Sequence, residues 1–141
     1  MKKIRLSSTN IVDAMGAANM ALINGQIIRR MYVPDSLGYI LLLALNQATG
    51  GHSGTIAFGR ALGHMGSSYS FHVGNYATTT KTKWSDSGAV FYSVKKSGIE
   101  YVAVRKDSSI VLVQLITFYG AANSAFEYAS EASLTDIVQI P

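Results

Sequence analysis

The stretch VFYSVKKSGIEYVAVRKDSSIVLVQLITF, residues 90–118, decides the fold class of this chain. Apolar and polar residues alternate along its three segments, which are separated by polar connections at Ser97-Gly98 and at Asp107 to Ser109. Alternation with a period of two places apolar side chains on one face of a strand, and Gly, Asp and Ser are common in turns. The stretch therefore predicts three consecutive strands joined as a meander.

The same punctuated pattern covers the rest of the chain after Gly38. Short apolar or alternating segments are separated by connections rich in Gly, Asn, Asp and Ser. The expected strands are 39–45, 54–62, 67–73, 89–95, 99–105, 110–118 and, with weaker patterns, 124–128 and 136–140. Several short strands at regular spacing are typical of a β-sandwich or jelly roll. We therefore expect an all-β domain over residues 38–141.

The glycine-rich stretch 59–76, GRALGHMGSSYSFHVGNY, has some likeness to a phosphate-binding loop. Such a loop needs a lysine followed by Ser or Thr, and no lysine occurs between Lys3 and Lys81. After Gly66 the aromatic and apolar residues alternate with polar ones, which is the period of a strand. We expect the glycines at turns or bulges, and no nucleotide cofactor.

Before Pro34 the pattern changes to helical spacing. The apolar residues that follow steps of three and four are Ile4, Ile11, Met15, Ala18 and Leu22, with Ser8 and Gly25 in the same seam. This predicts a short N-terminal helical stem within residues 1–37, which three chains could join as a coiled coil. A single amphipathic helix packed on its own domain, or a partly extended segment, is the alternative. Pro34 then predicts a turn before the β domain.

The composition favours an oligomer. Hydrophobic residues make up 48% of the chain and charged residues only 14%, with a mean hydropathy of +0.20. A chain this apolar usually covers part of its surface with copies of itself. No apolar run reaches eighteen residues, so no membrane insertion is expected, and polar residues between 7 and 13 argue against a signal peptide.

The charge and the missing cysteine exclude several classes of function. The formal net charge is +4, but the basic residues occur in small separated groups rather than in a stripe with aromatic partners, so no nucleic-acid partner is expected. The chain has no cysteine, which rules out disulfides, thiolate metal ligands and a cysteine nucleophile.

No pattern of catalytic or metal-ligating residues stands out. Asp86 and Glu100 could meet across strands, but their spacing does not support a glycosidase pair. The three histidines, His52, His64 and His72, have no close-ligand spacing, although copies of one histidine could converge on a trimer axis. We expect no enzyme activity, no metal and no cofactor.

Binding is the function that remains. The run 75–86 combines aromatic, threonine and lysine side chains over the length of a long loop, and long loops on rigid sandwiches often carry recognition. The residues expected to bind a receptor are Tyr76, Thr79, Lys81, Lys83, Trp84 and Asp86. The alternative is that Trp84 anchors this run in the core and that its threonines form an edge strand.

The order of these segments resembles the C-terminal head or knob domains of tailed-phage fibres and tail needles. The likeness covers residues 38–141 and rests on GYILLLAL, SGTIAFGRALG, YSFHVGN and the late strands, in which IEYVAVRKDSSIVLVQL is similar to the penultimate hairpin of such heads. It implies a homotrimeric sandwich on a fibrous stem, located in the virion tail, whose loops contact a bacterial surface.

The resemblance leads to one expected function and two alternatives. We expect a viral fibre-tip adhesion domain that recognises a host glycan or outer-membrane protein. A structural tail plug without a specific ligand, or a small glycan-degrading enzyme with its site between subunits, would fit the same features. No individual receptor-binding residue follows from the resemblance, because such heads share no binding motif.

Overall fold

The structure is a computed structural model that describes residues 20–23, 26–45, 50–61, 65–77, 80–85 and 90–141. These residues contain strands and one 3-10 helix, and no α-helix. The elements are β1 (Met20–Ile23), β2 (Gln26–Tyr32), β3 (Gly38–Ala44), β4 (Gly50–Arg60), β5 (Met65–Ala77), β6 (Thr80–Ser85), β7 (Phe91–Lys96), β8 (Ile99–Lys106), β9 (Ile110–Gly120), β10 (Ser124–Ser130), η2 (Glu131–Ser133) and β11 (Thr135–Gln139).

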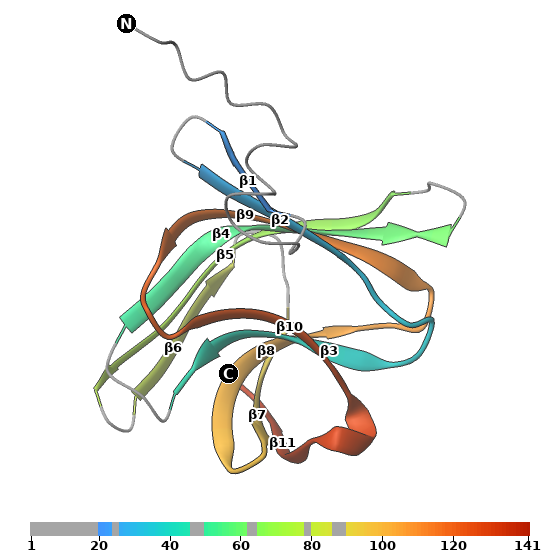
Figure 1. Cartoon of the computed structure of the whole chain (residues 1–141). Coiled ribbons are helices and arrows are strands. Elements are labelled where there is room, and N and C mark those ends of the chain that lie inside the picture. The colour runs from blue at the N-terminus through green and yellow to red at the C-terminus, as the bar shows by residue number, and fades with distance from the viewer. Residues whose placement is uncertain (1–19, 24–25, 46–49, 62–64, 78–79, 86–89) are drawn as a thin grey trace, which may run out of the picture.

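The strands form two antiparallel sheets that pack face to face (Figure 1). The first, which we call sheet A, has six strands in the order β1-β2-β9-β4-β5-β6. The second, sheet B, has five strands in the order β10-β3-β8-β7-β11. The two antiparallel sheets confirm the all-β part of the expected fold class.

Alternating apolar residues from both sheets fill the space between them. Sheet A contributes Ile56, Phe71 and Leu115, and sheet B contributes Leu42 and Phe91, all of them at most 5% exposed. Burying each of these side chains contributes roughly 1.5–3 kcal/mol to folding. This cluster is the main core of the domain.

Sheet B has a second apolar cluster on its other face. That cluster contains Tyr39, Leu41, Val94, Ala103 and Leu134. Strands β10 and β11 lie at opposite edges of sheet B, yet only η2 and the residue after it separate them in the chain. The sheet must therefore curl so that its edges approach, and Figure 1 shows this curl around β7, β11 and η2.

Strand β3 is buried along its whole length because it lies between these two clusters. A register shift between Leu41 and Leu43 in its pairing with β8 marks a bulge, which turns both Leu42 and Leu43 toward the main core. A continuous apolar run, rather than an alternating one, is the pattern of a strand with both faces covered.

The predicted meander over residues 90–118 is only partly right. Strands β7 and β8 form the expected hairpin, with Ser97 and Gly98 at φ of 51° and 79°, the left-handed values of a tight two-residue turn. Strand β9, however, lies in sheet A, so β8 and β9 are not a hairpin. The carboxylate of Asp107 accepts a hydrogen bond from the backbone N–H of Ser109 (2.9 Å) and shapes the turn that carries the chain between the sheets.

The N-terminal prediction is corrected where the structure describes it. The helical seam was expected to continue through Leu22, but Met20–Ile23 is a strand and pairs with β2. Strand β2 in turn pairs with β9, so the end of the expected stem (residues 1–37) is an integral part of sheet A. The rest of that seam, residues 1–19, lies outside the described residues.

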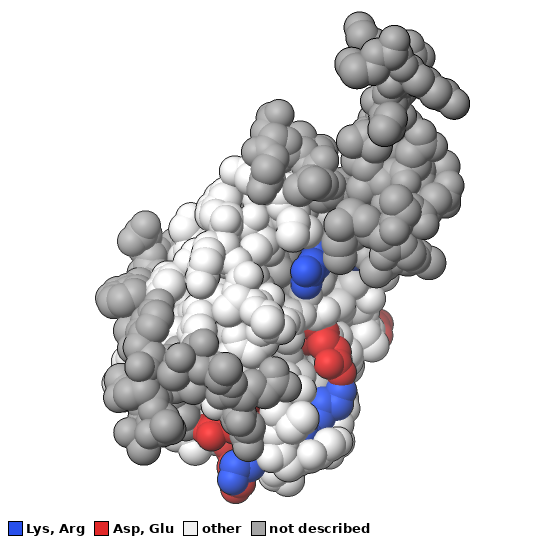
Figure 2. Space-filling view, turned by 60° about the vertical axis from the view of Figure 1, so that its left-hand side comes forward, with Lys and Arg blue, Asp and Glu red and all other residues white. Residues whose placement is uncertain are grey.

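Charge is distributed unequally between the two sheets. Strands β9, β4 and β5 at the centre of sheet A contain one charged residue, Arg60, and no acid occurs in any described strand of this sheet. The acids of the described residues lie on sheet B and on the connections beside it. Figure 2 shows a broad area of uncharged side chains with the charged ones toward its rim. Among the described residues, no helix is long and apolar enough to cross a membrane.

A buried histidine joins the two sheets. The ring of His52 on β4 is completely buried and lies edge-on to Phe71, with 5.4 Å between ring centroids. Its Nδ1 lies 2.9 Å from the carbonyl oxygen of Leu42 on β3, and its Nε2 lies 3.3 Å from Oγ1 of Thr117 on β9. Because a carbonyl only accepts, Nδ1 carries the proton and Nε2 accepts from the threonine hydroxyl. The ring is therefore neutral and fully hydrogen-bonded.

This histidine predicts a loss of stability in acid. Burial lowers the pKa of His52 below its ordinary value of 6.5, and the nearby Arg29 acts in the same direction, while the Leu42 carbonyl opposes it. The unfolded chain binds the proton more readily, so stability is complete above about pH 6.5 and falls as the pH drops below it. The expected loss is about 1.4 kcal/mol for each unit by which the pKa is lowered.

The measurement is the free energy of unfolding by urea at about pH 7.5 and about pH 5, where a histidine changes charge. His52→Gln should lower stability at both pH values but flatten the difference between them. His72→Gln is the comparison variant: burial also lowers the pKa of His72, but His72 is only half-buried, so this substitution should remove a smaller part of the pH dependence than His52→Gln. An undiminished pH dependence in His52→Gln would contradict the assignment.

Candidate functional site: a groove between β7, β8 and β11

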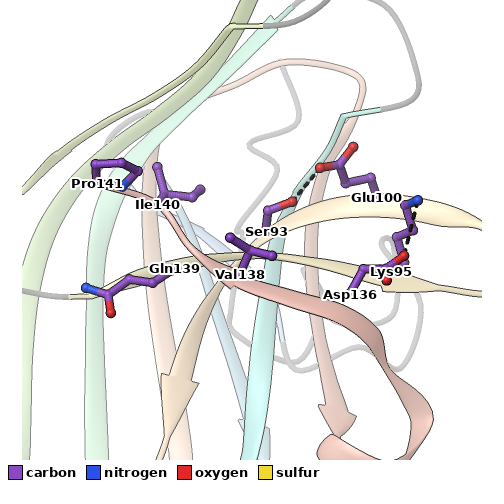
Figure 3. A pocket seen from close by; sticks show the side chains of 8 residues that line it. All are labelled: Ser93, Lys95, Glu100, Asp136, Val138, Gln139, Ile140 and Pro141. Carbon is purple, nitrogen blue, oxygen red and sulfur yellow. Dashed lines mark hydrogen bonds and ion pairs between the residues drawn. The ribbon is translucent and has the colours of Figure 1, made fainter.

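A groove of about 620 Å³ runs along the edge of sheet B where β7, β8 and β11 meet (Figure 3). Its volume lies within the range of about 300–1,000 Å³ that is usual for small-molecule sites. The residues that line it are Ser93, Lys95, Glu100, Asp136, Val138, Gln139, Ile140 and Pro141. Charged residues make up only 14% of this chain, and three of them, Lys95, Glu100 and Asp136, line this groove.

The first polar contact of the groove pairs β7 with β8. Ser93 is buried, with 6% of its surface exposed, and its hydroxyl donates a hydrogen bond to Oε1 of Glu100. Ser93 lies two residues after Phe91 on β7, so the strand period turns it toward the same face as that core residue. The pairing holds the Glu100 carboxylate beside the floor of the groove.

The second polar contact pairs β7 with β11. Nζ of Lys95 lies 3.3 Å from Oδ2 of Asp136, and both side chains are about half exposed (45% and 65%). An ion pair this exposed contributes at most about 1 kcal/mol to stability. The contribution of this ion pair to the stability of the fold is therefore small, and both charged groups remain accessible to a ligand.

Asp136 stands in an unusual backbone conformation. Its φ is 51°, and the pairing of β11 with β7 shifts register between Thr135 and Val138, which marks a bulge. A non-glycine residue at positive φ costs on the order of 1 kcal/mol, and such strain and bulges concentrate at functional sites because they redirect a side chain. Here the bulge directs the carboxylate of Asp136 toward Lys95 and the groove.

The opposite end of the groove has two apolar residues, Ile140 and Pro141, and the amide side chain of Gln139 lies at the same end. Ile140 is buried, and its backbone N–H donates to the carbonyl oxygen of Phe91 at 2.8 Å, which fixes the chain after β11 against β7. Val138 is 61% exposed, an unusual position for a large apolar side chain. Figure 3 shows Val138 between the charged residues at one end and Ile140 with Pro141 at the other. The groove is thus amphipathic along its length.

This set of residues offers several groups for binding a ligand. Two carboxylates accept hydrogen bonds, an ammonium donates them, and the valine, isoleucine and proline offer apolar contact. Among the described residues no cluster of three His, Cys, Asp or Glu side chains could hold a metal ion. His52 and Ser53 are neighbours on β4 and Ser53 hydrogen-bonds His72 on β5, so His52 faces the core and His72 the outer side of sheet A, which separates the two rings.

The predicted receptor-binding residues fall on a different strand pair. Tyr76 lies near the end of β5, and Lys81, Lys83 and Trp84 lie on β6, where Trp84 pairs with His72 in register. Thr79 and Asp86 lie outside the described residues. The predicted long loop over 75–86 is wrong, because β5 and β6 form an edge hairpin of sheet A. The alternative of an edge strand in this run is confirmed for residues 80–85. Lysines are common on edge strands, where they oppose pairing with other chains.

The hairpin and the groove lie on the same side of the sandwich. Phe71 on β5 faces Phe91 on β7 across the core, with ring centroids 6.3 Å apart. Strand β6 adds outside β5 in one sheet, and β11 adds outside β7 in the other. The two edge strands therefore border one side of the molecule, and β6, the strand of Lys81, Lys83 and Trp84, lies on the same side as the groove.

Sequence reasoning missed most of this groove. From the sequence, Glu100 was considered as one of a pair of catalytic carboxylates with Asp86. In the structure, Glu100 and Asp136 line the same groove. The signal that could have pointed there is the late pattern SLTDIVQIP, residues 133–141, in which Asp136 interrupts the start of a strand. No protein-family model, curated protein or solved structure matches this chain.

Proposed function

We propose that this chain is the head of a trimeric viral fibre, and that it attaches the virion to a bacterial cell by binding a surface glycan or outer-membrane protein. The observation that carries the proposal is the clustering of two recognition features on one side of a rigid sandwich. These are the amphipathic groove between β7, β8 and β11, and the β5–β6 edge hairpin with its lysines and tryptophan. Recognition residues held on strands are positioned with little loss of entropy on binding.

The uncharged centre of sheet A supports the trimer. On its outer side Ile28 of β2 pairs with Ile116 of β9, Tyr32 pairs with Leu112, and Phe118 is 53% exposed. Arg30, which pairs with Gln114 between the first two pairs, is the charged residue of this row. Exposed apolar and aromatic side chains in a charge-depleted area are typical of the centre of subunit interfaces. Light scattering of the purified chain tests this, and the expected mass is that of three chains. A monomer would contradict the trimer.

Replacing Trp84 by alanine tests the hairpin. We expect binding to host cells to fall at least about tenfold, because an aromatic anchor typically contributes 2 kcal/mol or more at an interface. The mass and the unfolding midpoint should stay unchanged if Trp84 serves recognition. Loss of folding in Trp84→Ala would instead support the alternative in which the tryptophan anchors the core.

The glycan-degrading enzyme is the second candidate, favoured by the two carboxylates in one groove. Glycoside hydrolysis uses two carboxylates that flank the bond to be cleaved. The discriminating measurement is the release of reducing ends from purified host polysaccharide. The adhesion proposal predicts binding without release, and release that Glu100→Gln abolishes would establish the enzyme instead.

A further inference from the structure

We propose that the groove between β7, β8 and β11 is a binding site for a neutral sugar, and that it discriminates against anionic glycans. The inference rests on the proposed function, and it specifies which part of the molecule meets the receptor and what the receptor is made of. It is carried by the identity of the lining residues, their contacts and their arrangement along the groove.

The polar end of the groove matches the hydroxyl groups of a sugar. A sugar hydroxyl both donates and accepts, and neighbouring hydroxyls on a ring present such groups in pairs. Oxygens of Glu100 and Asp136 accept from hydroxyls, and Nζ of Lys95, which has three hydrogens to donate, accommodates one more acceptor beside Asp136. Hydrogen bonds to charged partners are the stronger kind, so these groups orient a polyhydroxyl ligand.

The apolar end matches the other character of a sugar ring. A pyranose carries C–H groups between its hydroxyls, and these need contact with apolar atoms once water is displaced. Val138, 61% exposed in the middle of the groove, offers that contact, and Ile140 and Pro141 extend it (Figure 3). The separation of charged and apolar residues along one groove suits a ligand that is itself amphipathic.

The charges of the lining give the selectivity. Two carboxylates, Glu100 and Asp136, face one ammonium, Lys95, so the side chains of the lining sum to one negative charge. A uronate or phosphate group in the groove would meet like charge from both carboxylates, which is unfavourable. A neutral sugar meets no such repulsion, and both carboxylates then serve as acceptors.

The backbone of β11 positions the carboxylate of Asp136 before a ligand binds. Asp136 is fixed by the bulge at positive φ and by its contact with Lys95. A side chain that is already ordered loses little entropy on binding, which raises affinity without additional contacts. Positioning of this carboxylate would explain the positive φ of Asp136, which strand pairing alone does not require.

The test uses the full chain, fluorescently labelled, on an array of neutral and anionic bacterial polysaccharides and on whole bacterial cells. The expected result is binding to cells and to at least one neutral polysaccharide, no binding to the uronate- or phosphate-bearing ones, and no effect of EDTA. Binding confined to anionic polysaccharides, or abolished by EDTA, would overturn the inference. Binding to cells with no polysaccharide signal would overturn it while the adhesion function stands, and binding to neither would overturn both.

Substitutions then locate the site. Glu100→Gln and Asp136→Asn keep the shapes of the side chains, and each is expected to weaken binding to the neutral polysaccharide at least about tenfold, the loss typical of a hydrogen bond to a charged group. The matched controls are Lys96→Met and Glu127→Gln, because Lys96 and Glu127 form an ion pair in the same sheet that does not line the groove. Equal binding by the groove variants and the controls would place the receptor site elsewhere.

A second variant separates binding from folding. Asp136→Gly removes the carboxylate but suits the positive φ at this position, so the protein should unfold no more easily than the native chain. Binding should nevertheless fall at least about tenfold, as in Asp136→Asn. Native affinity in both Asp136 variants would refute the role of this carboxylate.

Discussion

Replacing Gly54 by alanine is expected to destabilise the protein by at least about 3 kcal/mol, the upper end of the range for overpacking. Gly54 lies on β4 where its pairing with β9 shifts register, and a Cβ there would stand 2.2 Å from the carbonyl oxygen of Ile116. The obstacle is backbone rather than the end of a side chain, so the two central strands of sheet A would have to separate. The measurement is urea unfolding at fixed protein concentration.

Gly59→Ala is the matched control for this substitution. Gly59 lies on the same strand, but its added Cβ would first meet the side chain of Leu112, at 3.2 Å. The nearest atom is Cβ of Leu112, and at this distance a shift of a few tenths of an ångström relieves the contact, so the expected change is within about 1 kcal/mol, as for mild changes of packing. If both variants lost the same stability, the close approach at Gly54 would not be the cause.

Phe91→Ala is expected to have a similarly large effect, a loss of about 3–5 kcal/mol, because the ring is fully buried and no neighbour can fill the space it leaves. The ring contacts Phe71 across the core, and the carbonyl of Phe91 accepts the hydrogen bond from Ile140 that secures the groove. The same variant should therefore weaken sugar binding even below its unfolding temperature.

The measurement pairs chemical unfolding with binding to the neutral polysaccharide in the array. Phe91→Leu keeps most of the volume and should cost roughly 1–1.5 kcal/mol, as volume-conserving core changes do, with binding retained. A stable Phe91→Ala protein would mean that the two sheets do not depend on this contact. Full binding by a destabilised Phe91→Ala would separate the groove from the core.

The strands of sheet B could be predicted from the sequence because their patterns are simple. GYILLLA is a short apolar run, and FYSVKK with IEYVAVRK alternates around a Ser-Gly turn, so β3, β7 and β8 were expected close to their true bounds. Strand β2 was missed because Arg29, on the inward-facing row with Ile27 and Met31, interrupts the apolar alternation. Its Nε is buried without a hydrogen-bond partner among the described residues.

Local sequence patterns did not predict strand β6 or the groove, for two different reasons. TKTKWS has almost no apolar alternation because it is an edge strand, and its identity as a strand depends on pairing with β5. The groove joins residues 93–100 to residues 136–141 through a bulge and a curled sheet. Local sequence patterns do not predict pairing between segments so far apart, so the proximity of Glu100 and Asp136 is known only from the structure.

The position of β11 also determines when the groove can form as the chain folds. The β7–β8 hairpin is local and can form within microseconds, but β11 pairs with β7 only after the chain has built β8, crossed to β9 in the other sheet and returned through β10. Contacts between segments so far apart in sequence close slowly. The groove is therefore complete only once β11, which follows all the other described strands in the chain, has paired with β7.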